Sequence, residues 1–172
     1  VDGFRTMPEP DSLRVAPENV APLTLPAEAF TYQPAPGAVV YQFKNGDQER
    51  KIYCNTEVTE TEREQLRQLQ EEVKRRGLTF MPSIVVMATR FLSRARGDAQ
   101  KAVKLMQATN AWRQEYFGPG PVADADVLED MRHGIVYFTG RDSALRPTIV
   151  VRAVRIPAQW YRERRIAKLI RL

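Results

Sequence analysis

Hydrophobic side chains recur at helical intervals through the middle of the sequence, between residues 59 and 132. This spacing is typical of amphipathic helices. A first helix is predicted from Thr59 to Arg76, because the Thr59 hydroxyl and the Glu62 carboxylate can cap each other's backbone donors. Gly77 follows the last helical residue and suits the left-handed backbone that often ends a helix. The apolar stripe of this helix is narrow, so we expect it on the surface.

Two further helices and a short one are expected next. Ser83 can cap a helix whose apolar residues cover more than one face, which predicts a buried helix. Asp98 is expected to cap the following helix, and the alternating glycine and proline residues at 118–121 end it. A short helix is predicted at about 124–132. The segment 58–133 is therefore predicted to contain three to four helices.

Extended patterns lie on both sides of this helical region. Residues 38–53 are predicted to form a short hairpin, with Asn45 and Gly46 at its turn, because this pair suits the positive φ angles of tight hairpin turns. On the C-terminal side, two runs rich in β-branched and aromatic residues predict strands at 135–138 and 148–154. The sequence thus combines short strands with helices.

The N-terminal segment 1–36 is rich in proline and has no sustained apolar period. Proline at this density excludes a long helix or a central strand. Its spaced hydrophobic residues can still lie in grooves of another surface while the backbone stays extended. That surface is either the chain's own globular part or a protein partner, and we favour a partner.

Composition excludes several classes of function. Hydrophobic residues make up 43% and charged residues 27% of the chain, which is ordinary for a globular protein. No apolar run approaches the roughly 18–20 residues that a transmembrane helix needs, so no transmembrane span is expected. Cys54 is the only cysteine and His133 the only histidine, so we expect no metal site, no cofactor and no catalytic nucleophile. The chain is predicted not to be an enzyme.

Positive charge is concentrated near the C-terminal end of the sequence. The formal net charge is +5, and residues 141–172 hold most of the excess of arginine and lysine. A last helix is predicted from Ala158 to Leu172, with apolar residues opposite basic ones. Such a helix suits an anionic membrane surface or a groove on a protein partner, and a solvated arginine-rich face is the simpler alternative. The candidate contacts are Trp160, Arg164, Arg165, Lys168, Leu169 and Arg171.

Several stretches follow a recognisable order of motifs. Residues 90–98 have the sequence RFLSRARGD, and a Trp-Arg pair follows at 112–113. Residues 133–142 have the sequence HGIVYFTGRD, and residues 146–152 have the sequence RPTIVVR. Together these stretches resemble the helical leader and the first two strands of the CRAL-TRIO family. The resemblance covers about residues 58–172.

We therefore predict an α+β fold with four parts, of which the resemblance implies the last two. These are an extended proline-rich arm at 1–37, a short β-hairpin at 38–57, the CRAL-TRIO helical region at 58–133, and the truncated start of the α/β lipid-binding domain, two strands and one helix, at 134–172. CRAL-TRIO proteins, which include phosphatidylinositol transfer proteins, hold one apolar ligand and perform no covalent chemistry. Because the resemblance ends after two strands and one helix, no head-group-binding residue of the family is carried over.

Two functions are therefore expected as alternatives. The first is a non-enzymatic lipid-binding or lipid-transfer protein of CRAL-TRIO type, seen as its N-terminal part, with a phospholipid or another hydrophobic ligand. The second is a pocketless accessory subunit that braces a larger assembly, such as one at an organellar membrane, through its arm and its basic helix. Nucleic acid is not expected, since few aromatic residues interleave the basic ones. A cytoplasmic and an organellar location, each peripheral to a membrane, stay open.

Overall fold

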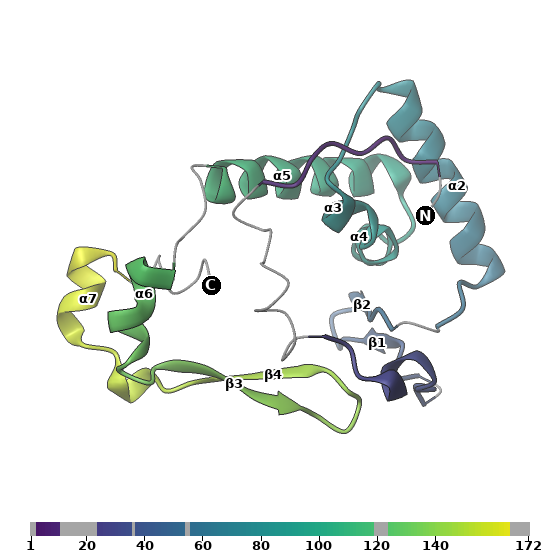
Figure 1. The fold of residues 1–172 in the computed structure, drawn as a ribbon. Helices are drawn as coiled ribbons and strands as arrows, with labels where there is room; N and C mark the ends of the chain where they lie inside the picture. Colours follow the sequence, from purple (N-terminus) through teal and green to yellow (C-terminus); the bar gives the residue numbers. More distant parts are fainter. Residues whose placement is uncertain (1–2, 11–23, 36, 54–55, 119–123, 166–172) are drawn as a thin grey trace.

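The structure is a computed structural model that describes residues 3–10, 24–35, 37–53, 56–118 and 124–165. The chain combines helices with two antiparallel sheets of two strands each (Figure 1), which confirms the mixed α+β class. The elements in chain order are the 3-10 helix η3 (Ala27–Phe30), β1 (Val40–Gln42), β2 (Gln48–Arg50), α2 (Glu60–Arg75), α3 (Pro82–Val85), α4 (Ala88–Arg94), α5 (Ala99–Phe117), α6 (Asp124–Met131), β3 (Val136–Arg141), β4 (Pro147–Val151), the 3-10 helix η4 (Ala153–Arg155) and α7 (Ala158–Glu163).

Residues 3–10 rest on the chain's own helical region. The backbone N–H of Met7 donates to the carbonyl oxygen of Phe80 at 2.9 Å. The thioether of Met7 accepts a hydrogen bond from Nδ2 of Asn110 at 3.4 Å. This part of the proline-rich arm therefore lies on its own globular part, the alternative that we did not favour. The segment 11–23 lies outside the described residues, and a partner for it stays a prediction.

The β1–β2 hairpin forms where the sequence predicted it. Val40 pairs with Arg50 in antiparallel register. At the turn, Gly46 adopts a φ of +82°, which glycine tolerates without steric cost. Asn45 contributes through its side chain, whose Oδ1 accepts a hydrogen bond from the backbone N–H of Asp47 at 3.0 Å.

Helix α2 begins and ends as predicted, to within one residue. Thr59 Oγ1 accepts a hydrogen bond from Glu62 N at 3.2 Å, and Thr59 N donates to Glu62 Oε2 at 3.0 Å, which completes the capping box. Gly77 follows the helix with a φ of +63°. Leu69 and Val73 are the buried side chains of this helix, so one narrow face packs inward and the rest is exposed.

The helix predicted after Ser83 is in fact two helices, α3 and α4, and Ser83 does not cap either. Ser83 lies inside α3, whose N-cap position is Met81. The Ser83 N–H donates to Oε1 of Glu9 at 2.7 Å, so a carboxylate 74 residues away in the sequence supplies the cap. Between the two helices, Met87 N bonds to the carbonyl oxygen of Ile84, three residues back, and this tighter bond interrupts the α-helical ladder.

Helix α5 completes the larger core. Asp98 caps it as predicted, since its Oδ1 accepts a hydrogen bond from Lys101 N at 3.0 Å. The helix packs against α2, α3 and α4. The buried residues of this core come from α2 to α5 and the loops between them: Leu69, Val73, Phe80, Met81, Ile84, Val85, Ala88, Leu92, Ala95, Ala102, Val103 and Met106.

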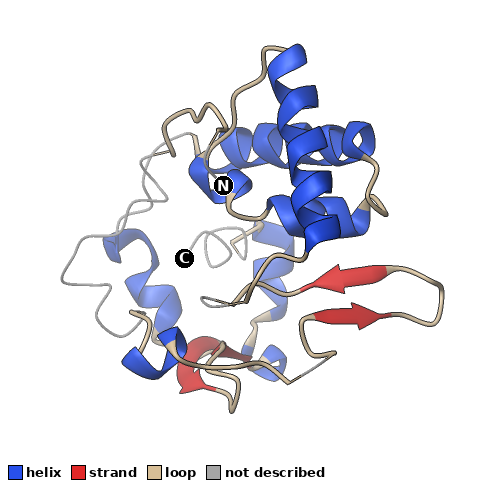
Figure 2. Ribbon diagram, turned by 90° about the vertical axis from the view of Figure 1, so that its right-hand side faces the viewer, coloured by secondary structure: helices blue, strands red, loops and turns tan. Residues whose placement is uncertain are grey.

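A second, smaller buried cluster lies near α6 and α7. Val127 of α6, Ile135 before β3 and Trp160 of α7 are each 1% exposed. The β3–β4 hairpin runs along the lower edge of the molecule in Figure 1, from α6 and α7 towards β1 and β2. In Figure 2 the helices α2 to α5 occupy the upper part of the molecule, and the strands lie below them.

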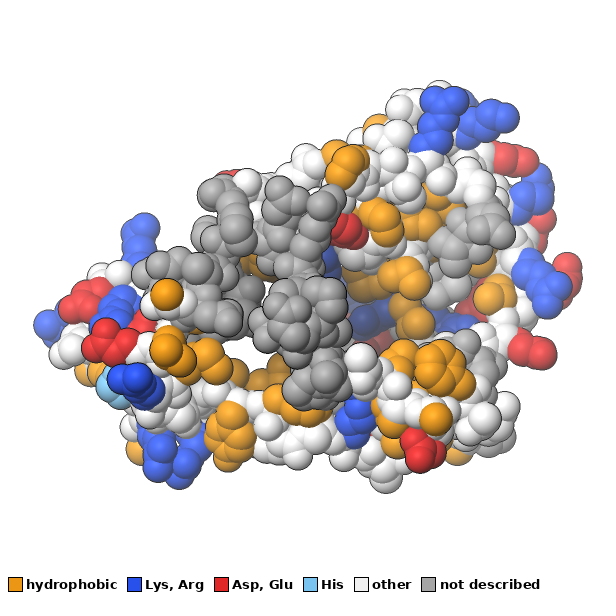
Figure 3. All heavy atoms as spheres, in the orientation of Figure 1, with side chains coloured by type: hydrophobic (Ala, Val, Ile, Leu, Met, Phe, Trp, Pro, Cys, Tyr) orange, Lys and Arg blue, Asp and Glu red, His pale blue; other side chains and the backbone are white. Residues whose placement is uncertain are grey.

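The β3–β4 hairpin differs from the predicted strands in its ends. Gly140, with a φ of +111°, lies at an irregularity in the pairing beyond which β3 continues to Arg141. Strand β4 ends at Val151, before the predicted end, because η4 follows. Figure 3 shows hydrophobic side chains at the surface along the lower edge of the molecule, where Figure 1 places this hairpin. The exposed large hydrophobic residues from this part are Tyr137, Phe138, Ile149, Val151 and Val154.

Candidate functional site

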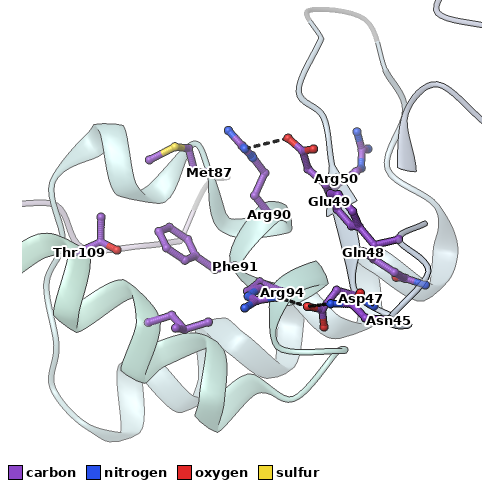
Figure 4. A pocket seen from close by; sticks show the side chains of 12 residues that line it. Asn45, Asp47, Gln48, Glu49, Arg50, Met87, Arg90, Phe91, Arg94 and Thr109 are labelled. Carbon is purple, nitrogen blue, oxygen red and sulfur yellow. Dashed lines mark hydrogen bonds and ion pairs between the residues drawn. The ribbon is translucent and has the colours of Figure 1, made fainter. Parts of the chain in front are cut away.

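Charged side chains gather where the β1–β2 hairpin meets α4 (Figure 4). Arg90 Nη2 lies 3.3 Å from Glu49 Oε1. Asp47 accepts hydrogen bonds from Arg94 Nη1 at 2.5 Å and from Arg96 Nη2 at 3.3 Å. The hydrogen bond from Arg94, and then that from Arg96, hold the pKa of Asp47 below its ordinary value. The arginines of the RFLSRARGD stretch are therefore paired within the chain.

This arrangement decides between two interpretations of those arginines. Such arginines can contact an external anion or form internal ion pairs, for which Asp98 and Asp130 are candidate acids. The pairs are internal, but the acids are those of the hairpin. Asp98 instead caps α5 and pairs with Lys101 at 3.4 Å, and Asp130 pairs with Arg165. No local pattern indicates the hairpin partners, because more than forty residues separate them from α4.

A hollow of about 600 Å³ lies beside these ion pairs. Figure 4 shows Arg90 and Arg94 reaching towards Glu49 and Asp47 of the hairpin, whereas Met87 and Phe91 lie farther from it, on the side of Thr109. Every charged group that Figure 4 joins by a dashed line is neutralised by another of this chain. We therefore interpret this hollow as part of the contact between the β1–β2 hairpin and the helices, rather than as the preferred candidate for a ligand-binding site.

Arg50 fixes the hairpin to the start of α2. Its side chain is 5% exposed, and its Nε donates to Glu62 Oε1 at 2.8 Å. The guanidinium also donates to the carbonyl oxygen of Lys51. Burial alone raises the pKa of Glu62, but the hydrogen bonds from Arg50 and from Thr59 outweigh it, so that this pKa lies below its ordinary value. The buried pair therefore depends on both partners.

A second hollow, also of about 600 Å³, is more apolar. Its walls come from parts of the chain that are distant in sequence. These are the segment around η3, the residues that follow β2, the helices α2 to α4, and the turn between β3 and β4. The aliphatic side chains that line it are Leu25, Ala29, Ile52, Val58, Leu66, Val85, Val86, Ala88, Ala144, Leu145 and Pro147. We call this space the apolar hollow.

Arginine and tyrosine side chains add a polar side to the apolar hollow. Arg146 also lines it, and its Nε and Nη2 contact Asp142 Oδ2 at 2.7 Å and 2.6 Å. That carboxylate raises the pKa of Arg146, with smaller electrostatic contributions from Tyr53 and Tyr32. Arg141 donates to the carbonyl oxygens of Leu145 at 2.9 Å and Thr24 at 3.1 Å. The turn after β3 is thus held in one conformation beside the hollow.

Asp142 holds this turn from within. Its Oδ1 accepts hydrogen bonds from the backbone N–H groups of Ala144 at 2.9 Å and Arg146 at 3.0 Å. The hydrogen bonds from Arg146 are the largest cause of a lowered pKa of Asp142. Local sequence assigns no role to residues 140–147, because an aspartate near a turn is only a turn signal until its neighbours in space are known.

The structure describes three of the predicted contact residues of the last helix, namely Trp160, Arg164 and Arg165. Trp160 is 1% exposed, with His133 edge-on to its ring at a centroid separation of 5.1 Å. Arg165 pairs with Asp130 and lies over the Trp160 ring, 4.7 Å from its centroid. Trp160 is therefore buried away from any partner in this structure, whereas the Arg165 side chain is ion-paired and remains 36% exposed. Arg164 is exposed, at a left-handed backbone position that ends α7 at Glu163.

The remaining contact residues, Lys168, Leu169 and Arg171, lie outside the described residues, as does Cys54. Within the part that the structure describes, no group of three or more His, Cys, Asp or Glu side chains is placed to hold a metal ion. Among the helices of that part, none combines the length and the apolar character needed to cross a bilayer.

Comparison of the chain with protein-family models, with curated proteins and with solved structures finds no match. The resemblance of residues 58–172 to the CRAL-TRIO family therefore stays a prediction from the motifs. The apolar hollow and the surfaces around it are the features of this chain that bear on its function.

Proposed function

We propose that this chain binds one hydrophobic ligand of the lipid class in the apolar hollow, as the N-terminal part of a CRAL-TRIO-type lipid-binding or lipid-transfer protein. The observation that supports the proposal is the hollow itself. Its volume of about 600 Å³ falls within the range of about 300–1,000 Å³ that is usual for small-molecule sites. Its walls are mainly aliphatic, and a smaller number of polar side chains also line it.

Binding without covalent chemistry follows from the same lining. The polar side chains that line the hollow are arginine, tyrosine and threonine. Burial of a hydrocarbon chain against aliphatic walls provides the affinity, and the polar groups orient the ligand. The protein would then act as a carrier, which releases the molecule that it binds.

Lipid extraction from vesicles tests this proposal. The chain is incubated with vesicles of phosphatidylcholine, phosphatidylinositol and hexadecanoate, separated from them, and analysed for bound lipid by mass spectrometry. The decisive variant is Val86→Trp, because Val86 lines the hollow and is 55% exposed, so that the larger ring fills the hollow without entering the core.

The matched control is Val154→Trp, the same change at a side chain that is 93% exposed and does not line the hollow. We expect the wild type and V154W to retain lipid, and V86W to retain about tenfold less. A wild-type chain that returns from the vesicles without lipid would exclude the proposal, as would equal retention by both variants.

A second candidate function is the accessory subunit. The observation that favours it is the exposed apolar surface of the β3–β4 hairpin, where Ile149 is 64% and Val151 59% exposed. A two-stranded sheet is marginal in water unless another layer covers it. In this interpretation a protein partner covers the hairpin, and binding of the partner rather than of a lipid is the activity.

A further inference from the structure

The charged side chains that line the apolar hollow share one sign. Among the described residues that line it, the ionisable side chains are Arg50, Arg141, Arg146, Tyr32 and Tyr53. The carboxylates that pair with Arg50 and Arg146, those of Glu62 and Asp142, do not line the hollow. The cationic groups thus face the hollow, and their anionic partners lie behind them.

Arg146 is the arginine best placed to bind a ligand. Its Nε and Nη2 are bonded to Asp142, which fixes the plane of the guanidinium. The other end, Nη1, bonds to no acceptor in the described part of the chain. A guanidinium presents donors along more than one edge, so Arg146 can hold Asp142 and a second anion at once. Arg50, by contrast, is buried and fully used by Glu62 and carbonyl oxygens.

Two tyrosines accompany Arg146 at this side of the hollow. The rings of Tyr32 and Tyr53 are 5.7 Å apart and tilted by 35°, and both line the hollow. Arg146 lines the same hollow. A phenol donates one hydrogen bond to an anionic oxygen, so the two hydroxyls and the guanidinium offer donors of the kind that a carboxylate or phosphate accepts.

We propose that the apolar hollow selects a single-chain amphiphile with an anionic head group, a carboxylate or a phosphate, which Arg146 and the tyrosine pair bind while the aliphatic walls take the hydrocarbon chain. This inference rests on the proposed function, because it concerns the same hollow. It adds the chemical class of the ligand. A neutral head group gains only ordinary hydrogen bonds there, whereas an anion gains the stronger charge-assisted ones.

Direct titration of the full chain with three ligands of equal chain length tests the selection. The ligands are hexadecanoate, hexadecyl phosphate and hexadecan-1-ol, each below its aggregation concentration. We expect at least one anion to bind about tenfold to hundredfold more tightly than the alcohol, which is the effect of one charge-assisted hydrogen bond. The tighter of the two anions shows whether the head group is a carboxylate or a phosphate.

The variant Arg146→Gln should lower the affinity for the anions to near that for the alcohol. The matched control is Arg132→Gln, because Arg132 is exposed, does not line the hollow and forms no ion pair within the described residues. Tyr32→Phe removes one hydroxyl, keeps the ring, and leaves the turn intact. It should weaken anion binding severalfold. Because this variant does not alter the turn, it tests the head-group site independently of any disturbance that the loss of Arg146 causes there.

The outcomes separate this inference from the proposed function. If the alcohol and both anions bind equally, the selection is wrong, whereas hydrophobic binding in the hollow stands. If R146Q and Tyr32→Phe keep the full preference for anions, the head group lies elsewhere and the inference is overturned. If none of the three ligands binds, the proposed function and the inference fail together.

Discussion

Arg50 and Arg67 both form ion pairs, but their side chains differ greatly in exposure to solvent. The side chain of Arg50 is 5% exposed beside Glu62 at 2.8 Å. That of Arg67 is 57% exposed, between Glu64 and Glu71 on the surface of α2. An exposed pair gains little over hydration, whereas removal of one partner of a buried pair leaves a charge without compensation. The burial of an ion pair, more than the number of such pairs, therefore sets the contribution to the stability of the fold.

This contrast predicts different costs for the same substitution. Arg50→Met should lower the free energy of unfolding by about 3 kcal/mol, because Glu62 loses its partner where water reaches it poorly. Arg67→Met should change it by less than about 1 kcal/mol. Urea unfolding followed by circular dichroism measures both. Equal effects would show that the Arg50 pair does not anchor the hairpin.

Asp47 gives a second prediction at this scale. Its pKa is lowered, first by the hydrogen bond from Arg94 and then by that from Arg96. A carboxyl whose pKa is lowered in the folded state stabilises the fold at pH values above its ordinary pKa of 3.8. That contribution is lost as the pH falls through the folded-state pKa. The hairpin contact should thus persist at pH 4 and weaken below it.

An NMR titration of the Asp47 carboxyl carbon follows this pKa directly. Arg94→Gln should raise the pKa of Asp47 towards its ordinary value, because the main hydrogen bond is gone. Arg90→Gln is the matched control on the same helix. Arg90 pairs with Glu49, so its loss should leave the pKa of Asp47 nearly unchanged. The opposite pattern would place the hairpin differently on α4.

At the scale of elements, the cap of α3 links the two ends of the helical region. Oε1 of Glu9 accepts the Ser83 N–H at 2.7 Å, and Ser83 Oγ lies 3.2 Å from Arg113 Nη1 of α5. A helix of four residues has few bonds of its own. Its position therefore depends on the segment 3–10 and on α5 together.

Glu9→Ala should lower the free energy of unfolding by about 1 kcal/mol, the usual effect of losing a helix cap. Amide hydrogen exchange should also become faster in residues 3–10 and in α3, and stay unchanged in α2. Glu28→Ala is the control, since Glu28 is exposed in η3. Unchanged exchange in α3 after the loss of Glu9 would show that the cap is not needed.

Elements with local signals were the ones that the sequence predicted well. The capping box of Thr59 and Glu62, the Asp98 cap and the turn at Gly46 each depend on residues within a few positions. The cap from Glu9 could not be found this way, since 74 residues separate it from Ser83. The break between α3 and α4 was also not predicted, because an apolar run gives no sign of a backbone hydrogen bond that reaches back three residues instead of four.

At the scale of the whole molecule, the exposed apolar hairpin is the feature with the largest consequence for solution behaviour. Ile149, Val151 and Val154 are 64%, 59% and 93% exposed. Contiguous apolar surface drives association. We expect the chain to associate with itself as its concentration rises, unless a partner or a further layer covers the β3–β4 hairpin.

Sedimentation at several concentrations checks this expectation. The double variant Ile149→Lys with Val151→Lys should shift the chain towards the monomer by about tenfold or more in concentration. The control adds the same two charges at exposed polar positions of the same hairpin, Thr139→Lys with Ser143→Lys. If both variants act alike, net charge rather than apolar surface governs association. A wild-type chain that stays monomeric throughout would remove the support for the accessory subunit.

The candidate site was out of reach of the sequence for the same physical reason. The apolar hollow is lined by Leu25, Ile52, Leu66, Val85 and Leu145, among others, and no periodic pattern joins residues so far apart. The last helix shows the converse. Its apolar and basic residues suggested an exposed docking face, but Trp160 is buried, and Arg165 pairs with Asp130 and lies over the Trp160 ring. An amphipathic pattern does not say which surface receives the apolar side.

The contacts of Met7 also set an order of events during synthesis. Its thioether accepts a hydrogen bond from Gln114 at 3.5 Å across 107 residues of sequence. A ribosome that adds about 5–20 residues per second needs roughly 5–20 s to cover that interval. During this time the segment 3–10 has left the ribosome before the helix that receives it exists. Enzymes that act on nascent chains therefore meet this segment uncovered, although the finished fold holds it in place.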